Sequence, residues 1–531
     1  DDVESRGLGD VYKRQVLNTC AQLSKVGGGV AVDVTRLRGR NETIKGVENA
    51  SSGVIPVLKL LEDTFAYVNQ LGQRNGAGVA YLNIFHWDIE EFLDTKKINA
   101  SEKSRLQTLS IGTIIPNKFM ELAQKGNEYY VFAPHTVYQA TGKHLDEIDL
   151  NEEYESLVNN PKIKKRLLNP RKILVNISKM QFESGYPYIM FSDNANKDHA
   201  LKELGRVKMS NLCTEIFQLQ ETSIINDYGV EDMIKRDVCC NLGSLNIANV
   251  MDSKLIKESV YSAIDALTVV SDETFIENAP GVNKANKELH AIGLGAMNLH
   301  GYLTKSYIPY ESEDAKEFAS QFFMMVNYYS LKRSLEIAKE RKETFLDFKK
   351  SEYANGKYFN KYLQNDYTAK SQKVAKLFEG MEVPTKEDWA TLKEEVAKHG
   401  LYHAYRLAIA PTQSIGYVQN ATPSVTPVVD LIERRTYGDS TTYYPMPYLS
   451  PYNVLLYKSA FNMDMFKMID LIAVMQEHVD QGISTTLYVS SDTTTKELTR
   501  YYIYAYKKGL KALYYTRTKN LAFEECLVCS V

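Results

Sequence analysis

The stretch NLCTEI, residues 211–216, places an amide, a thiol and a carboxylate at alternate positions. In an extended segment alternate side chains share a face, so Asn211, Cys213 and Glu215 point the same way if this stretch is a strand or an extended loop. Such a face can hold a hydroxyl group, take a hydrogen atom or proton from a substrate, and accept a proton from an adjacent oxygen. Taken alone, this pattern is more often the solvated side of an edge strand, so its interpretation depends on the rest of the chain.

A second cysteine segment follows within thirty residues of the first, as CNLGSLN at residues 240–246. The chain holds six cysteines, and structural disulfides are not expected in a long chain without a secretion signal, because that compartment is reducing. Cys20 and Cys239 are therefore expected to be small buried hydrophobic residues.

A turn-rich segment, PTQSIG at residues 411–416, precedes the sequence NAT at residues 420–422. Hydroxyl groups and free backbone N–H groups in such a turn suit a phosphate oxyanion. An ordinary Ser/Thr turn has the same composition, so this segment also needs support from elsewhere.

The end of the chain carries a tyrosine pair and a dithiol. Tyr514 and Tyr515 are adjacent, and neighbouring tyrosines can relay an electron hole because each ring can be oxidised with loss of a proton; with 36 tyrosines in the chain, adjacency alone is not informative. Cys526 and Cys529 supply only two zinc ligands and have no histidine pair nearby, so we do not expect a metal here. A mobile dithiol suits thiol–disulfide exchange.

Composition excludes several classes of protein. Apolar residues make up 44% of the chain and charged residues 24%, as in ordinary globular proteins. The net charge of −3 does not provide the basic surface of a nucleic-acid-binding protein. No stretch approaches the roughly 18 uninterrupted apolar residues of a membrane helix, and the first fifteen residues lack the apolar region of a signal peptide. A cytoplasmic location is the default expectation.

Apolar periodicity alternates between helix and strand along the chain. It predicts helices over residues 16–25, 54–68, 313–338 and 498–508, and strands over residues 30–34, 79–85, 185–191, 484–489 and 511–515. This alternation implies an α/β fold of mostly parallel strands joined by crossover helices. We expect one catalytic domain over residues 16–520, after a non-native leader at residues 1–15 and before a flexible redox-active tail at residues 521–531.

Together these segments resemble the large, catalytic subunits of class I ribonucleotide reductases, and are closest to the class Ib form. The resemblance runs from about residue 16 to residue 531, and NLCTEI and CNLGSLN look like the active-site strands of that family. It implies a ten-stranded α/β barrel with surrounding helices, and the reduction of ribonucleoside diphosphates to 2′-deoxyribonucleoside diphosphates. Cys213 would carry a transient thiyl radical that takes the 3′ hydrogen, and Glu215 would be the base for the 3′ hydroxyl. Asn211 would position the substrate, and Cys240 would be one of two cysteines that deliver reducing equivalents.

The same resemblance assigns partners and further contacts. Tyr514 and Tyr515 would receive the radical from a separate small subunit with a manganese- or iron-tyrosyl centre, and Cys526 and Cys529 would exchange with a glutaredoxin- or thioredoxin-like protein. Arg38 falls where the family contacts an allosteric nucleotide, a dNTP or ATP, at the interface of a large-subunit homodimer. The turn at residues 411–416 would hold the substrate's diphosphate. The implied substrate contacts are Gly29, Asn211, Leu212, Cys213, Thr214, Glu215, Pro411, Thr412, Gln413, Ser414 and Ile415.

The chain departs from the family before residue 16. Full-length members carry there a helical region and a first barrel strand with the second redox cysteine. Cys20 does not match that cysteine, so Cys240 has no evident partner and the barrel is expected to be incomplete at its N-terminus. We therefore expect that the chain as written does not complete repeated turnovers.

Three other functions remain open at this point. A class II reductase would use adenosylcobalamin, and would need neither the tyrosine pair nor the tail. A non-catalytic fragment would bind substrate and effector nucleotides without turnover. A thiol oxidoreductase centred on Cys526 and Cys529 would leave the NLCTEI stretch without a purpose.

Overall fold

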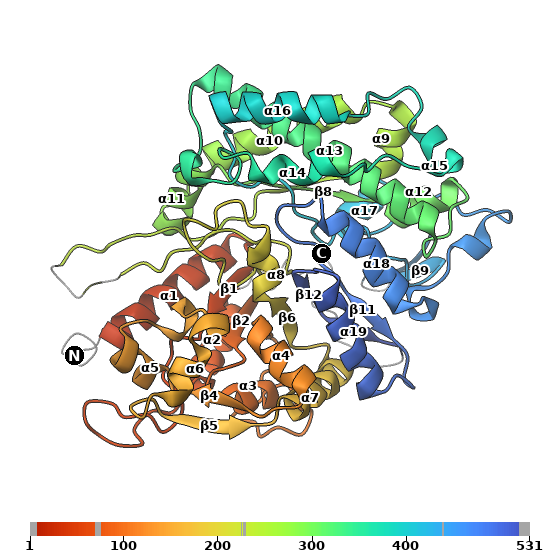
Figure 1. Cartoon of the computed structure of the whole chain (residues 1–531). Coiled ribbons are helices and arrows are strands. Elements are labelled where there is room, and N and C mark those ends of the chain that lie inside the picture. The colour runs from red at the N-terminus through yellow and green to blue at the C-terminus, as the bar shows by residue number, and fades with distance from the viewer. Residues whose placement is uncertain (1–7, 69–75, 225, 227–229, 438–439, 520–531) are drawn as a thin grey trace.

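The computed structural model describes residues 8–68, 76–224, 226, 230–437 and 440–519 (Figure 1). Its strands are β1 (Val30–Asp33), β2 (Gly78–Asn83), β3 (Ser110–Ile115), β4 (Tyr129–Phe132), β5 (Lys165–Leu168), β6 (Tyr188–Phe191), β7 (Leu242–Asn246), β8 (Gly293–Met297), β9 (Ile432–Tyr437), β10 (Ser440–Pro445), β11 (Leu487–Val489), β12 (Ala512–Leu513) and β13 (Thr516–Thr518).

The α-helices surround these strands. They are α1 (Leu8–Lys25), α2 (Ile55–Tyr67), α3 (Ile89–Asp94), α4 (Asn117–Lys125), α5 (Pro134–Thr141), α6 (Leu150–Asn159), α7 (Pro170–Ser184), α8 (Ser192–Lys197), α9 (Ile247–Ser253), α10 (Ile256–Glu273), α11 (Pro280–Leu289), α12 (Leu299–Lys305), α13 (Glu313–Arg341), α14 (Asn360–Gln364), α15 (Gln372–Leu377), α16 (Lys386–His399), α17 (Ser414–Val418), α18 (Met465–Gln476) and α19 (Thr495–Lys507). None of the helices that the structure describes is long and apolar enough to cross a membrane.

Five strands form one sheet in the order β1-β2-β3-β6-β12. The first four run parallel, and β12 is antiparallel to β6. Every residue of β2, β3 and β6 is buried, as expected for parallel strands that are covered on both faces. The prediction of parallel strands with crossover helices is therefore confirmed for this half of the molecule.

The backbone ladder continues beyond β12 into a second half. Tyr514 N donates to Thr485 O over 2.8 Å, and parallel bridges then join Ile483 to Ile409 and Leu407 to Leu294 of β8, which pairs with β7. Among the described residues no backbone hydrogen bond joins β7 to β1. The arrangement is that of an α/β barrel with one open seam between these two strands.

Most of the predicted elements are present, with shifted ends. The helix expected over residues 16–25 begins earlier, at Leu8, and the strand expected over residues 484–489 is shortened to β11. Two antiparallel pairs, β4 with β5 and β9 with β10, were not expected from the sequence. Short hairpin strands carry too few residues for their periodicity to be distinguished from that of loops.

Helix α13 lies at the centre of the helical layer in the upper part of Figure 1. Ser312 caps its N-terminus by accepting from Ala315 N at 3.2 Å, and Glu313 and Asp314 lie in the first turn, where the helix dipole favours negative charge. It packs against α10, α16 and α18, so apolar side chains are buried on nearly all of its faces. The apolar residues of the helix predicted from residue 313 therefore belong to the core, and they cover more than one face of the helix.

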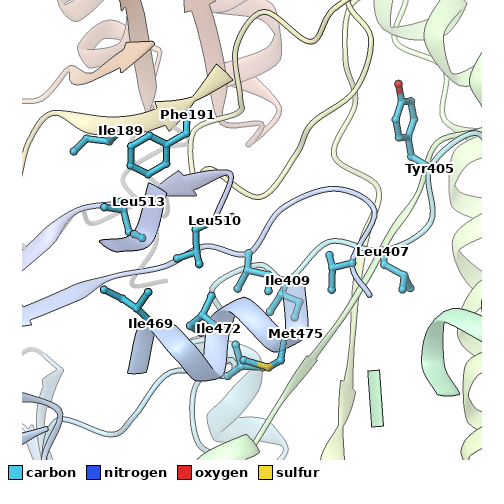
Figure 2. Close-up of a cluster of buried hydrophobic side chains, with 14 of the residues drawn as sticks. Ile189, Phe191, Tyr405, Leu407, Ile409, Ile469, Ile472, Met475, Leu510 and Leu513 are labelled. Carbon is cyan, nitrogen blue, oxygen red and sulfur yellow. The ribbon is translucent and has the colours of Figure 1, made fainter. Parts of the chain in front are cut away.

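Figure 2 shows the apolar cluster that joins the two halves. Its side chains come from β6, from residues 407–409, from α18 and from the chain around β12, and the labelled aliphatic members are all buried: Ile189, Leu407, Ile409, Ile469, Ile472, Leu510 and Leu513. Because Leu513 is in this cluster, the position of the following residue, Tyr514, is set by packed core.

Truncation of Ile409 to alanine is expected to lower the free energy of unfolding by about 3 kcal/mol, because the side chain has no solvent exposure and its loss leaves a cavity. Urea denaturation measures the change. Ile98→Ala is the matched control, since Ile98 is 60% exposed and its truncation should change stability by no more than about 0.5 kcal/mol. Equal effects of the two substitutions would show that the cluster does not hold the halves together.

Candidate active site

The thiol segment (residues 210–216) has no regular secondary structure, and the expected extended conformation is wrong. Thr214 has φ of +67°, and Thr214 N donates to Asn211 O over 3.4 Å, so the chain makes a tight turn. The Asn211 side chain closes this turn, because its Oδ1 accepts from the backbone N–H groups of Glu215 at 3.0 Å and Ile216 at 3.1 Å. Asparagine commonly stabilises turns in this way, and this preference outweighed the alternation of polar residues.

The turn nevertheless brings the predicted polar groups together. Asn211 Nδ2 donates to Glu215 Oε1 at 2.8 Å and to Cys240 Sγ at 3.6 Å. One amide therefore joins the carboxylate to the thiol of the second cysteine segment. Cys239 does not take part in this contact, since its thiol donates to Asn241 Oδ1 at 3.4 Å.

Cys213 contacts the tyrosine pair. The Tyr514 hydroxyl donates to Cys213 Sγ at 3.7 Å, and the Tyr514 and Tyr515 rings lie 4.5 Å apart between centroids. Tyr514 is buried, and its ring also contacts that of Tyr188 at 4.7 Å. The structure thus places Tyr514, an oxidisable side chain from near the end of the chain, against the Cys213 thiol.

Glu215 is a buried carboxyl group. Burial raises the pKa of Glu215 to about 7, because the charged form loses its hydration, and the hydrogen bond from Asn211 offsets only part of this. Its Oε2 has no hydrogen-bond partner among the described residues, whereas Oε1 is bound by Asn211. A carboxyl group with one unused oxygen and a pKa near neutrality can exchange a proton with a bound ligand.

Two glycines allow a close approach behind the thiol segment. A Cβ atom at Gly29 would lie 2.7 Å from Leu212 Cδ2, and one at Gly112 would lie 2.4 Å from the Tyr81 ring. The Tyr81 hydroxyl donates to Asn211 O at 2.9 Å, so this tyrosine supports the turn. The substrate contact expected at Gly29 stays a prediction, and Tyr81 was missed. Gly112 inside an apolar strand was the one available signal, since such a glycine often marks a close contact.

A cavity of about 250 Å³ lies beside the thiol segment, at the open seam of the barrel. Asn211 and Cys240 line it, together with Gly29, which immediately precedes β1, and the buried Cys20 of α1. Cys213 and residues 411–415 are not among its lining residues. Burial raises the pKa of Cys20 to about 12, so this thiol is the inert core residue that the sequence predicts.

The turn predicted to bind phosphate lies at the start of α17. The Thr412 hydroxyl is buried and accepts from Ser424 N at 2.7 Å, so this predicted ligand already has an internal partner. Ser414 begins the helix, and Ile415 is exposed. A diphosphate site at this turn stays a prediction.

The remaining predicted residues lie elsewhere. Arg38 is in the loop after β1, where its guanidinium donates to Thr43 O, and it does not line the cavity. Cys526 and Cys529 fall outside the described residues.

The chain is similar to known proteins over almost its whole length. A family model described as "Ribonucleotide reductase, barrel domain" matches residues 10–516. The chain is 54% identical to the ribonucleoside-diphosphate reductase subunit alpha of Bacillus subtilis (strain 168), over 99% of this chain and 75% of that protein. It is 42% identical to the subunit of the same name from Mycoplasma pneumoniae, over 99% of this chain and 72% of that protein. The Mycoplasma genitalium subunit is 41% identical, over 100% of this chain and 75% of that protein.

Proposed function

This chain belongs to the ribonucleotide reductase family, and from that premise we propose that it reduces ribonucleoside diphosphates to 2′-deoxyribonucleoside diphosphates with Cys213 as the radical thiol. The contact between the Tyr514 hydroxyl and Cys213 Sγ, at 3.7 Å, carries this assignment. Both groups can lose a hydrogen atom, and no other residue lies between them in this contact. A tyrosyl radical at Tyr514 would take the hydrogen of the Cys213 thiol, which leaves tyrosine and a cysteine thiyl radical.

The groups around Cys213 suit the steps that follow. The thiyl radical would take the 3′ hydrogen of the substrate, and the free oxygen of Glu215 would accept the proton of the 3′ hydroxyl. Loss of the 2′ hydroxyl as water requires two electrons and two protons, which two thiols supply by forming a disulfide. Cys240 is one proposed donor, since Asn211 holds its sulfur next to the turn at 3.6 Å, and the second thiol comes from the dithiol supplied in the assay.

The proposed radical source is a separate small subunit. Tyr515 lies against Tyr514, with the two ring centroids 4.5 Å apart, so it is the proposed entry point for the electron hole. We assign the chain to the class I form, closest to class Ib, with a dimetal-tyrosyl partner, a homodimer of large subunits, and nucleotide effectors that bind near Arg38. Cys526 and Cys529 are proposed to reduce the active-site disulfide and to exchange with a redoxin.

Two assays test the proposed function and its alternatives. The chain is incubated with CDP, a dithiol, and either a class Ib small subunit or adenosylcobalamin, and dCDP is measured by chromatography. We expect product only with the small subunit; product with adenosylcobalamin would contradict the class I assignment. Binding of CDP, measured separately by calorimetry, identifies a nucleotide-binding chain that does not turn over.

The pH dependence of the single-turnover rate of CDP reduction should show the proton transfer at Glu215. The deprotonated carboxylate is the base, so activity should rise with pH and level off above about 7, with a fall of about tenfold per pH unit below that value. Rates between pH 5.5 and 8 measure this limb. Glu215→Gln should lower activity at all pH values and remove the dependence of the rate on pH below about 7. A limb near pH 6 that survives in Glu215→Gln would assign the titration to another group, such as Asp33, whose pKa burial raises to about 6.

A further inference from the structure

The chain that leads into the thiol segment is held by side chains rather than by a strand ladder. Residues 206–208 lie outside the helices and strands. The Asn196 amide binds the backbone of Val207 twice, with Nδ2 donating to Val207 O at 3.0 Å and Oδ1 accepting from Val207 N at 2.8 Å. Lys208 N donates to Gln220 Oε1 at 3.2 Å. The placement of the thiol segment therefore depends on individual side-chain contacts.

Asp146 makes the charged contact in this region. Its Oδ2 accepts from Lys208 Nζ at 2.6 Å, and its two oxygens accept from Arg36 Nε at 2.8 Å and Arg36 Nη2 at 3.0 Å. The Asp146 side chain is 6% exposed, so solvent screens these contacts only weakly. The bidentate arginine contact also fixes the orientation of the carboxylate.

The three members of this ion-pair triad (Arg36, Asp146 and Lys208) come from different parts of the fold. Arg36 belongs to the loop after β1 that also carries Arg38, and Asp146 lies in the short 3₁₀ helix Leu145–Glu147. Lys208 precedes the thiol segment by two residues. All three line the cavity that Asn211 and Cys240 also line.

We propose that Asp146 is a positioning residue of the active site, which holds the thiol segment in place relative to the Arg36–Arg38 loop by binding Lys208 and Arg36 at the same time. The expected effect of Asp146 on turnover rests on the proposed function. Its expected effect on the mobility of the thiol segment does not. A contact that only stabilised the fold would not single out the thiol segment for increased mobility.

Glu147 provides a matched control for this inference. It is the neighbour of Asp146 in the same 3₁₀ helix, and it binds Arg36 Nη2 at 2.9 Å but makes no contact with Lys208. Glu147→Gln removes the same charge as Asp146→Asn and leaves the Lys208 contact intact. Lys208→Met removes that contact from the other side, and serves as the test variant if Asp146→Asn does not fold.

Amide hydrogen exchange of the whole chain, followed by mass spectrometry, is the primary test. In Asp146→Asn and Lys208→Met we expect exchange at residues 208–216 to be faster by about tenfold, while exchange in α6 and in the Glu147→Gln variant stays as in the unmodified chain. Unchanged exchange at residues 208–216 in the folded test variants, or an equal increase in Glu147→Gln, would overturn the proposal.

Turnover of CDP with the small subunit is the second readout. We expect the single-turnover rate at saturating CDP to fall by about tenfold in the two test variants with the Kd for CDP changed by less than about twofold, because the reacting groups are displaced while the substrate contacts remain. A normal single-turnover rate in variants with a mobile thiol segment would overturn the positioning role. If neither the unmodified chain nor any variant reduces CDP, the proposed function fails. The exchange result still decides whether Asp146 holds the thiol segment.

Discussion

Replacement of Cys213 by serine is expected to abolish the formation of dCDP by the chain assembled with its small subunit. A serine O–H bond is much stronger than a thiol S–H bond, so a tyrosyl radical does not take its hydrogen. We expect a loss of at least about a thousandfold, which corresponds to about 4 kcal/mol in the activation free energy. The measurement is a single-turnover assay with chromatographic detection of dCDP, which does not depend on re-reduction of the disulfide.

The control for this substitution is Cys239→Ser. Cys239 is also a half-buried free thiol, but it donates to Asn241 Oδ1 at 3.4 Å and has no contact with Tyr514 or Asn211. Its replacement should change the single-turnover rate by less than about threefold, in line with the small effects of substitutions outside a site. CDP binding should survive in both variants. Product formation by Cys213→Ser at more than a tenth of the normal rate would refute the assignment of the radical thiol.

Replacement of Tyr514 by phenylalanine is expected to have an effect of similar size. The substitution keeps the ring, and with it the packing against Tyr188 and Tyr515, but it removes the hydroxyl that lies 3.7 Å from Cys213 Sγ. Phenylalanine cannot be oxidised at the potential of tyrosine, so the hole does not reach the thiol. We expect product formation to fall by about a thousandfold or more.

Tyr188→Phe is the matched control for Tyr514→Phe. The Tyr188 ring centroid lies 4.7 Å from that of Tyr514, against 4.5 Å for Tyr515, but the Tyr188 hydroxyl donates to Ser110 Oγ at 3.2 Å. It should retain at least about a tenth of the activity. Denaturation midpoints of both variants show whether folding is affected. Equal losses in the two variants, with equal stability, would mean that the aromatic cluster as a whole and not the Tyr514 hydroxyl serves the reaction.

Several residues of the candidate site could be named from the sequence, and others could not. The motifs around Cys213, Cys240 and Tyr514 could be recognised in the sequence. In the structure Tyr514 contacts Cys213, and Asn211 contacts Cys240. Tyr81 was not found, because it lies in the fully buried strand β2 and looks like any other core aromatic residue there. Asp146 was missed as well, since an acidic residue in a polar stretch is usually solvated.

The geometry of the thiol segment shows where local reasoning was insufficient. Alternation predicted that Asn211 and Glu215 share a face of an extended chain, and they do meet, but across a turn that the Asn211 side chain closes. Both explanations bring the same residues together, so their proximity was predictable and the backbone conformation was not. The positive φ of Thr214 has no sequence signal, because threonine rarely adopts it.

The sequence by itself determined the chemistry that this chain can offer and most of its helices and strands, because residue type and apolar period act over a few residues. Only the tertiary structure decided which of these groups meet. Tyr514 and Cys213 are 301 positions apart, and they come into contact because β12 pairs with β6 and because Leu513 packs into the core between the halves. Contacts at this range depend on the packing of the whole fold, which no short pattern encodes.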